Sequence, residues 1–351
     1  MIESTPDRWN PADWLDAIVS RLRPPGVAAG FALASLLGIL LLGTVLTRGR
    51  TDEGMAALAD YAGSAGIEPA QLVAGAARAY SFVFLSDIDG AAEPKRIAAA
   101  AIEAAALEAG LDAVGLEVPE DEQPHIDAYL RSDPEDVGIL MRRPAALRSH
   151  TGTERDYLEI YRTVWRLNRE LDALRQIRIF ALDLPGWPPS RALPPRALAE
   201  GLSRRTQHMA ERIETAILGR NPRARVLLFL NGYHGLQNGR GVLEVNGGGT
   251  IPVEWLASQL RERHSGDVYT ILIDGVRGGV ASPGTYSGTK AGPALRRALR
   301  GRPVAVRIDN RFDFLAQPIH ENGGPGVRLE LRPRSYRLGD VADAYIHAGG
   351  R

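Results

Sequence analysis

Short apolar segments, separated by polar or helical stretches, constrain the fold of this chain more than any other feature. They read FVFL from residue 82, AVGLEV from 113, IRIFALDL from 177, RVLLFLN from 225, VYTILIDGV from 268 and PVAVRID from 303. Continuous apolar runs of this length, rich in β-branched residues, are typical of strands buried on both faces. Helical patterns cover residues 92–110, 157–176 and 202–218 between them. The alternation predicts an α/β domain with a mostly parallel central sheet flanked by helices.

Residues 26–47, GVAAGFALASLLGILLLGTVLT, contain no charged side chain. As a helix this segment would be roughly 33 Å long, enough to cross a hydrocarbon core of about 30 Å. A cleaved signal peptide is the alternative, although such peptides normally start nearer the N-terminus. We predict a single transmembrane helix. Arginines are slightly more numerous before the segment than after it, which favours a cytoplasmic N-terminus and a main domain outside the cytoplasm.

These patterns divide the chain into an N-terminal segment 1–25, a membrane anchor 26–47, a helical lead-in 48–78 and the α/β domain 79–351. Within the domain, the stretch LPGWPPSRALPPRAL at 184–198 is predicted to be a long surface loop beside or over the end of the sheet, because proline lacks a backbone donor. NGGGT and GGPG are predicted turns. A last strand is expected near residues 344–347.

Composition excludes several classes of function. The net charge is zero and the basic residues are scattered, so the sequence has no electrostatic footprint for nucleic acid. The chain contains no cysteine, which excludes disulfides, thiolate metal sites and a cysteine nucleophile. It also has no Gly-x-Ser-x-Gly elbow, no Walker loop and no dinucleotide-binding fingerprint.

Residues that could carry chemistry follow four successive predicted strands. They are Asp87 and Asp89 after the first, Glu117 at the second, Asp183 at the third and His234 after the fourth. Ligands of open α/β sheets bind beyond the carboxyl ends of the strands, so these side chains are expected to converge. Carboxylates at the ends of three strands and an imidazole at the end of the fourth are suitable ligands for a divalent metal such as Mn, Mg or Ca. Such a metal could activate a bound water molecule. We therefore predict Asp87, Asp89, Glu117 and His234 as metal ligands, with Asp89, His234 and Asp183 as catalytic residues.

Each of these residues also has a purely structural interpretation. Asp89 could cap the Ala-rich helix that follows it, with Asp87 in a turn. Glu117 could be an exposed strand end, and Asp183 could brace the Pro-rich loop. His234 lies in a Gly-flanked turn, where packing gives no reason for a histidine.

Tyr157, Tyr161 and Trp165 recur every four residues and form an aromatic stripe on a predicted helix. Such a stripe is usually part of the core. The alternative is a lid or a wall for a flat apolar ligand.

Several motifs in the region 80–276 together resemble three related families: the erythromycin esterases, the ChaN haem-uptake proteins and the Tiki-type metalloproteases. DAVGLEVPEDEQPHIDAYL is similar to the second strand of ChaN proteins, with Glu117 at its glutamate. RTQHMAERI resembles the Arg-x-x-x-Met-Ala helix of these families, and RVLLFLNGYHGLQ is similar to the strand that delivers their later histidine, here His234. The resemblance implies an α/β fold, a hydrolytic or haem-binding function, and a site at the strand ends.

The first motif departs from the family pattern. ChaN proteins have Gly-Glu-x-His there and the esterases Gly-Glu-x-x-His-Gly, whereas this chain has Ser86, Asp87, Ile88, Asp89 and Gly90. By the ChaN spacing, Asp87 takes the place of the glutamate and Asp89 that of the histidine. Aspartate replaces histidine poorly as a base near neutral pH, but it can still bind a hard metal ion.

Three functions remain open from the sequence. The first is a membrane-anchored, metal-dependent hydrolase of a small-molecule or peptide ligand. The second, implied by the ChaN resemblance, is a haem or iron binding protein that uses Tyr233 and His234, although neighbouring residues of an extended chain point in opposite directions. The third is an interaction domain that has lost its catalytic motif.

Overall fold

The structure is a computed structural model of the chain, and it describes residues 57, 59–87, 92–142, 154–188, 192–237, 240–274, 302–308, 315–316, 320–324, 326–332 and 336–349. These residues lie in one compact unit, Gly54–Arg351. The predicted anchor 26–47 and Asp89 lie outside the described residues, and for Asp87 only the backbone is described. In the described part of the chain, no helix is both long and apolar enough to cross a membrane.

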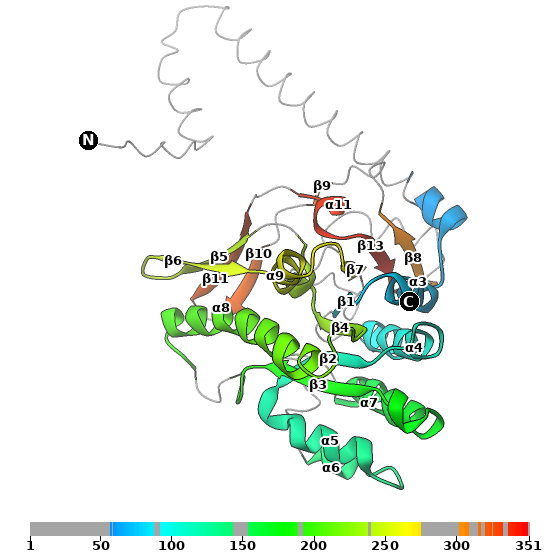
Figure 1. Ribbon diagram of the computed structural model, residues 1–351. Helices are drawn as coiled ribbons and strands as arrows, with labels where there is room; N and C mark the ends of the chain where they lie inside the picture. Colours follow the sequence, from blue (N-terminus) through cyan, green and yellow to red (C-terminus); the bar gives the residue numbers. More distant parts are fainter. Residues whose placement is uncertain are drawn as a thin grey trace, which may run out of the picture. The chain divides into compact units, whose positions relative to one another are not determined.

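A seven-stranded sheet forms the centre of this unit (Figure 1). Its order is β3 (Arg178–Asp183), β2 (Ala113–Pro119), β4 (Val226–Asn231), β1 (Phe82–Asp87), β7 (Val268–Asp274), β13 (Ala344–His347) and β8 (Val304–Arg307). Neighbouring strands are parallel except for the β13–β8 pair, which is antiparallel. The predicted fold class, an α/β domain with a mostly parallel central sheet, is confirmed, and so is the predicted last strand.

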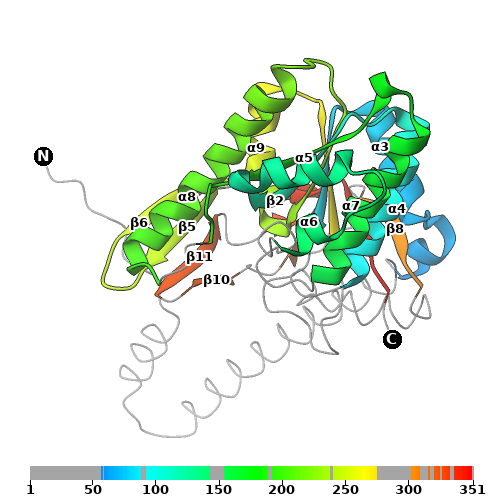
Figure 2. The same cartoon turned by 90° about the horizontal axis from the view of Figure 1, so that it is seen from below.

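Helices cover both faces of the sheet (Figures 1 and 2). Apolar residues of one face form a common core with α3 (Pro69–Ala79), α4 (Ala92–Ala109), α5 (Gln123–Arg131), α6 (Gly138–Met141) and α7 (Glu154–Glu170). The opposite face is covered by α8 (Pro195–Arg212), its π-helical continuation η4 (Ile213–Leu218) and α9 (Leu256–Arg263). The short elements are η1 (Glu120–Glu122), η3 (Ala173–Arg175), η5 (Gly232–Gly235) and α11 (Leu338–Val341).

Strand β2 illustrates how the sequence sets the orientation of a site residue. All seven of its residues are buried, because both faces of the sheet are covered. Val114, Leu116 and Val118 pack into the α4–α7 core, so Gly115 and Glu117 face α8. A Cβ atom at Gly115 would lie 2.6 Å from side-chain carbons of both neighbouring strands. Glycine therefore allows the three strands to pack closely just before Glu117.

A second, antiparallel sheet packs against the N-terminal half of α8 (Figures 1 and 2). It consists of β10 (His320–Gly324), β11 (Val327–Arg332), β5 (Arg240–Val245) and β6 (Thr250–Glu254). The hydroxyl of Ser203 on α8 donates to the carbonyl of Pro252 on β6 at 2.9 Å. β9 (Leu315–Ala316) and β12 (Tyr336–Arg337) form a separate pair. The sequence patterns predicted the turns of this region but not its sheet.

The Pro-rich stretch is only partly a loop. Residues 195–198 form the first turn of α8, which corrects the prediction of a loop to residue 198. The physical reason is that Pro195 occupies the first helical position, where the missing N–H has no partner to lose.

The aromatic stripe on α7 belongs to the core. Tyr157 and Tyr161 are fully buried, and Tyr161 packs edge-on against Tyr129 with ring centroids 6.2 Å apart. Trp165 is half-buried and its indole N–H donates to the carbonyl of Ser132. The interpretation as core packing is confirmed.

Candidate functional site

The carboxyl ends of β1, β2, β3 and β4 meet at one rim of the sheet. Asp87 of β1 lies opposite Asn231 of β4 in the parallel register. From β1 the chain continues into α4 on one face of the sheet, whereas β4 is followed by η5 and later by α9 on the other. Adjacent strands whose connections diverge in this way leave a crevice where α/β proteins bind ligands. The predicted site therefore lies at a topological switch point.

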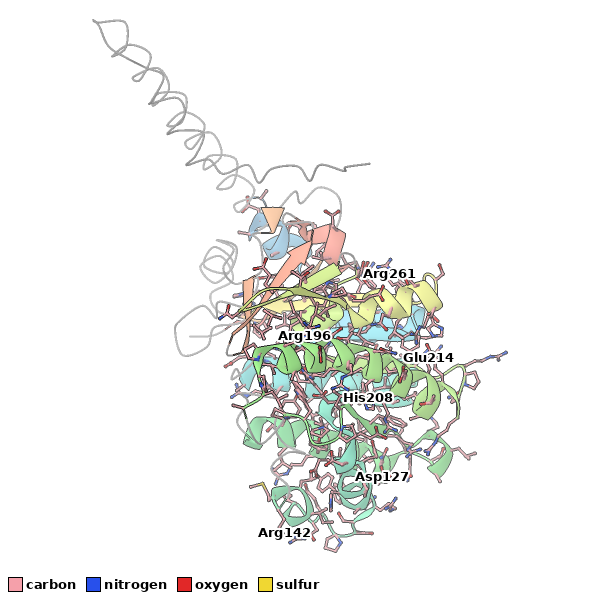
Figure 3. The ribbon with its side chains drawn as sticks, turned by 90° about the vertical axis from the view of Figure 1, so that its left-hand side faces the viewer. Asp127, Arg142, Arg196, His208, Glu214 and Arg261 are labelled. Atoms are coloured by element: carbon pink, nitrogen blue, oxygen red, sulfur yellow. The ribbon has the colours of Figure 1, made fainter. Side chains whose placement is uncertain are left out.

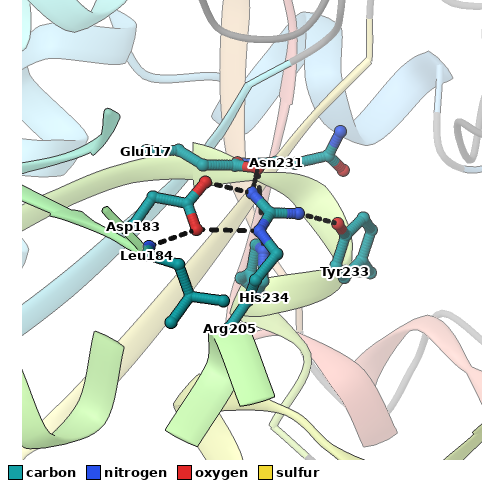
Figure 4. Close-up of polar contacts among 7 residues, drawn as sticks. All are labelled: Glu117, Asp183, Leu184, Arg205, Asn231, Tyr233 and His234. Atoms are coloured by element: carbon teal, nitrogen blue, oxygen red, sulfur yellow. Dashed lines mark hydrogen bonds and ion pairs between the residues drawn. The ribbon is translucent and has the colours of Figure 1, made fainter. Parts of the chain in front are cut away.

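Arg205 of α8 is the centre of this rim (Figure 4). Its Nη2 lies 2.5 Å from Oε1 of Glu117 and 2.6 Å from Oδ2 of Asp183, and its Nε donates to Oδ1 of Asp183 at 2.8 Å. Nη1 lies 3.4 Å from the hydroxyl of Tyr233. Arg205 thus joins Glu117, Asp183 and Tyr233, which come from β2, β3 and η5, in one hydrogen-bonded cluster.

The charged groups of the cluster are almost completely shielded from solvent. Arg205 is 1% exposed, Asp183 2% and Glu117 3%. Burial alone would lower the pKa of Arg205, but the carboxylates of Asp183 and Glu117 outweigh this effect and hold its pKa well above the ordinary value. The guanidinium is therefore permanently charged, and it compensates carboxylates that would be costly to bury alone.

His234 lies beside the cluster and is fully buried. Its Nε2 is 3.9 Å from Oε1 of Glu117. Glu117 also accepts a hydrogen bond at Oε2 from the backbone N–H of Asn231, at 2.9 Å. One carboxylate therefore contacts the arginine and the residue that begins the histidine-bearing turn, and it faces the imidazole. The predicted proximity of Glu117, Asp183 and His234 is present.

Tyr233 and His234 were expected to lie on an extended chain, but they do not. They lie in the 3₁₀ turn η5, which points both rings to the same side, with centroids 4.4 Å apart. This corrects the expectation that the two side chains diverge. Tyr233 is half-buried, and its ring also contacts Trp255.

The described residues do not fit the predicted metal site. Both oxygens of Glu117 already accept hydrogen bonds, one of them from the guanidinium of Arg205. A divalent cation beside Oε1 would be repelled by that positive charge. Within the described residues, no group of three acidic or histidine side chains is arranged to hold a metal. Asp89 and the side chain of Asp87 lie outside this description, so their role as metal ligands stays a prediction.

The residues proposed for haem do not fit that cofactor either. A haem would have to place its large flat ring directly beside the coordinating atom, and the imidazole of His234 is fully buried against its neighbours. The Tyr233 hydroxyl faces the cationic Arg205. The geometry of Tyr233 and His234 therefore does not fit a pair of haem ligands.

Two residues of the site were not predicted as site residues. Arg205 appeared only within a family-like helix motif, although an arginine in register with the apolar Met209 and Ala210 already indicates a buried cation that needs acidic partners. Trp187 of the Pro-rich stretch is the other. Its indole ring lies over the guanidinium, with the ring centroid 5.0 Å from Cζ of Arg205. This contact covers the cluster and adds a cation–π interaction.

Asp183 has the bracing role that the sequence offered as its structural interpretation, and its catalytic role stays a prediction. It binds Arg205, and its Oδ1 also accepts the backbone N–H of Leu184 at 2.8 Å. The loop that follows is held further by a hydrogen bond from the N–H of Gly186 to Asp121. These contacts hold the segment that carries Trp187 over the site.

Gly201 of α8 makes room for the Trp187 ring. A Cβ atom at Gly201 would lie 2.8 Å from Cζ3 of Trp187, whereas one at Gly75 of α3 would meet only the tip of Arg78, at 3.9 Å. We expect G201A to lower the free energy of unfolding by about 1–3 kcal/mol through overpacking. The matched variant G75A should raise it by about 0.5–1 kcal/mol through helix propensity. Denaturant titration of both variants checks the prediction, and stabilisation by G201A would contradict it.

Comparisons with known proteins support the fold. No protein-family model matches the sequence, and no curated protein matches it. An erythromycin esterase variant in its open conformation is 12% identical, with a TM-score of 0.51 over 79% of this chain and 92% of the other. A succinoglycan biosynthesis protein is 10% identical, with a TM-score of 0.52 over 80% of this chain and 89% of the other. Haem-bound ChaN of Campylobacter jejuni is more distant, at 13% identity and a TM-score of 0.37 over 58% and 85%. The resemblance to an erythromycin esterase is therefore confirmed at the level of the fold.

Proposed function

We propose that this protein is a hydrolase of neutral esters or amides, with His234 as the proton-transferring group. The observation that carries the proposal is the imidazole Nε2 3.9 Å from Oε1 of Glu117, at the switch point of the sheet. The imidazole of His234 is fully buried in the structure, so the proposal requires its turn to open transiently and admit a water molecule. A histidine beside a carboxylate can then take a proton from that water and return it to a leaving group. The structural neighbour named as an erythromycin esterase supports ester hydrolysis by analogy of fold.

Three side chains of the cluster have roles in this proposal. Glu117 stabilises the imidazolium that forms when His234 accepts a proton, as a carboxylate does for a catalytic histidine. Arg205 holds Glu117 in place through its guanidinium. Tyr233 is half-buried, whereas Glu117, Asp183 and Arg205 are buried, so it is the residue of this cluster that a substrate would meet first. Its O–H can donate to the substrate oxygen on which negative charge develops.

The charge of the cluster favours a neutral substrate. Glu117 and Asp183 contribute two negative charges and Arg205 one positive charge, so the three groups together carry a net charge of −1. A phosphate ester would bring further negative charge into this buried environment, where repulsion is poorly screened. Carboxylic esters and amides do not carry this penalty.

Hydrolysis of p-nitrophenyl acyl esters by the full-length chain tests the proposal. We expect turnover of the acetate and butyrate esters but not of p-nitrophenyl phosphate. H234Q should lower kcat/KM by about 10²–10⁴-fold, the usual contribution of a general base. H264Q is the matched control, because His264 is paired with Glu214 on another part of the molecule and lies outside the site.

Two results would contradict the proposal. Equal activity of H234Q and the unchanged protein would remove His234 from the reaction. Loss of activity in EDTA with recovery in Mn or Mg would instead support the metal-dependent version, in which Asp87 and Asp89 supply the ligands. Membrane attachment through residues 26–47 remains part of the proposal, supported by the uncharged sequence alone, and fractionation of the full-length chain tests it.

A further inference from the structure

The turn that carries His234 is held at both of its ends by carboxylates. At its start, the backbone N–H of Asn231 donates to Oε2 of Glu117 at 2.9 Å. At its end lies Gln237, three residues after the histidine and only 5% exposed. The side-chain amide of Gln237 donates to Oδ2 of Asp343, which directly precedes β13. Glu117 belongs to the proposed site, whereas Asp343 has no part in it so far.

Gln237 is fixed in three directions. Besides the bond to Asp343, its backbone N–H donates to the carbonyl of Val341 at 3.1 Å. Its own carbonyl accepts the hydroxyl of Ser258 on α9 at 2.8 Å. The residue is thus bound to α9 and to the segment before β13, two elements distant in sequence. These bonds fix the position at which the turn ends.

Asp343 is itself anchored in the sheet. Its Oδ2 accepts the N–H of Thr270 on β7 at 2.8 Å, and its own N–H donates to the carbonyl of Thr270 at 2.9 Å. Burial raises the pKa of Asp343, while the Thr270 N–H, the charge of Arg261 and the Gln237 amide act in the opposite direction. Arg261 lies on α9, the helix that also carries Ser258 (Figure 3). The carboxylate of Asp343 is partly buried and held in place by these groups, so it can accept a strong hydrogen bond from Gln237.

Gly235 completes the support from the sheet side. It follows His234 directly, and a Cβ atom there would lie 3.5 Å from Cγ2 of Thr270 and 3.6 Å from Cβ of Phe84. The backbone of the turn therefore rests on β7 and β1. Thr270 lies beside the turn and is hydrogen-bonded to Asp343, so it links the turn to the segment before β13.

We propose that Gln237 and Asp343 are positioning residues for His234: their hydrogen bond holds the end of η5 so that the imidazole stays enclosed beside Glu117. Neither residue touches the reacting atoms. The inference rests on the proposed function in one respect, that His234 is the functional residue. Its test needs no substrate.

Deuterium exchange at the imidazole C2–H of His234, measured by mass spectrometry on the full-length chain, tests the proposal. The exchange requires solvent access to the ring, so it reports how often the enclosed imidazole opens. We expect Q237L and D343L to speed the exchange by about tenfold, the effect of losing a hydrogen bond to a charged group. D343N keeps an oxygen that can accept both N–H groups. Its rate of exchange at His234 should therefore stay within about twofold of that of the unchanged protein.

Asn168→Leu is the matched control. Asn168 is also a buried amide, 7% exposed, and it holds the backbone of Ile177 through its Oδ1 and Nδ2 atoms. N168L removes comparable bonds on the α7 side of the sheet and should leave His234 exchange unchanged. His264 serves as an internal reference within every sample.

The results separate positioning from general stability and from the proposed function. Unchanged exchange in Q237L and D343L would overturn the inference, as would an equal increase in N168L. Faster exchange in D343N than in D343L would also overturn it. If the protein hydrolyses no ester, the proposed function fails while the exchange result stands. If H234Q abolishes hydrolysis but Q237L leaves the exchange unchanged, only the positioning inference fails.

Discussion

Replacement of Arg205 with methionine is expected to lower the free energy of unfolding by about 3–5 kcal/mol, because it leaves buried carboxylates without a counter-charge. Glu117 and Asp183 are at most 3% exposed and have Arg205 as a shared partner at 2.5 and 2.6 Å. Removing one partner of a buried ion pair lowers the free energy of unfolding by far more than the intact pair contributes to it. Thermal or denaturant unfolding of the full-length chain measures the effect.

An exposed ion pair of similar length provides the control. Nη1 of Arg78 lies 2.7 Å from Glu108, but the two side chains are 53% and 32% exposed. R78M should therefore cost at most about 1 kcal/mol. The triple variant R205M/E117Q/D183N, which also neutralises the carboxylates, should recover part of the stability lost in R205M. Similar losses in R205M and R78M would show that the cluster is solvated, contrary to its observed burial.

Truncation of Tyr161 to alanine is expected to be equally severe, with a loss of about 3–5 kcal/mol, the range for large aromatic side chains in a core. The ring is fully buried and packs against Tyr129. Burial, followed by the charge of Glu122, raises the pKa of the Tyr161 hydroxyl, so the residue stays neutral and suits an interior position. Denaturant titration measures the loss.

Leu174 offers the contrast for this prediction. It is also apolar but is 100% exposed, so L174A should change the free energy of unfolding by no more than about 0.5 kcal/mol. A small effect of Y161A would revive the alternative reading of the aromatic stripe as a lid or ligand wall. Tyr161 would then have to leave the core in solution.

Local sequence patterns predicted much of the central domain. The helix expected at 92–110 is α4, Ala92–Ala109, and the apolar segments became strands of the central sheet, all parallel to their neighbours except β8. The periodicity of a segment records which of its faces is buried, and this is a local property that a short window contains. The same logic placed Glu117, Asp183 and His234 at strand ends, where the structure brings them together.

Other features depend on segments that are distant in the chain. β4 lies between β1 and β2, and this order places Asn231 against Glu117 across more than a hundred residues. The second sheet joins residues 240–254 with residues 320–332. Such pairings reflect the free energy of the whole fold, and a local window contains no information about the partner. The sheet was therefore missed, although its turns were recognised.

The sequence by itself determined that acids and a histidine would lie at the rim of a parallel sheet, because strand polarity fixes where strand ends point. The tertiary structure decided what compensates their charge. The sequence around Glu117 leaves open whether its partner is a metal ion or a basic side chain from elsewhere in the chain. Either would compensate the charge of a buried carboxylate. Only the packing of α8 against β2 and β3 brings the guanidinium of Arg205 to Glu117 and Asp183. The interaction of two charges depends on the distance between them in the folded protein. The sequence pattern does not contain that distance.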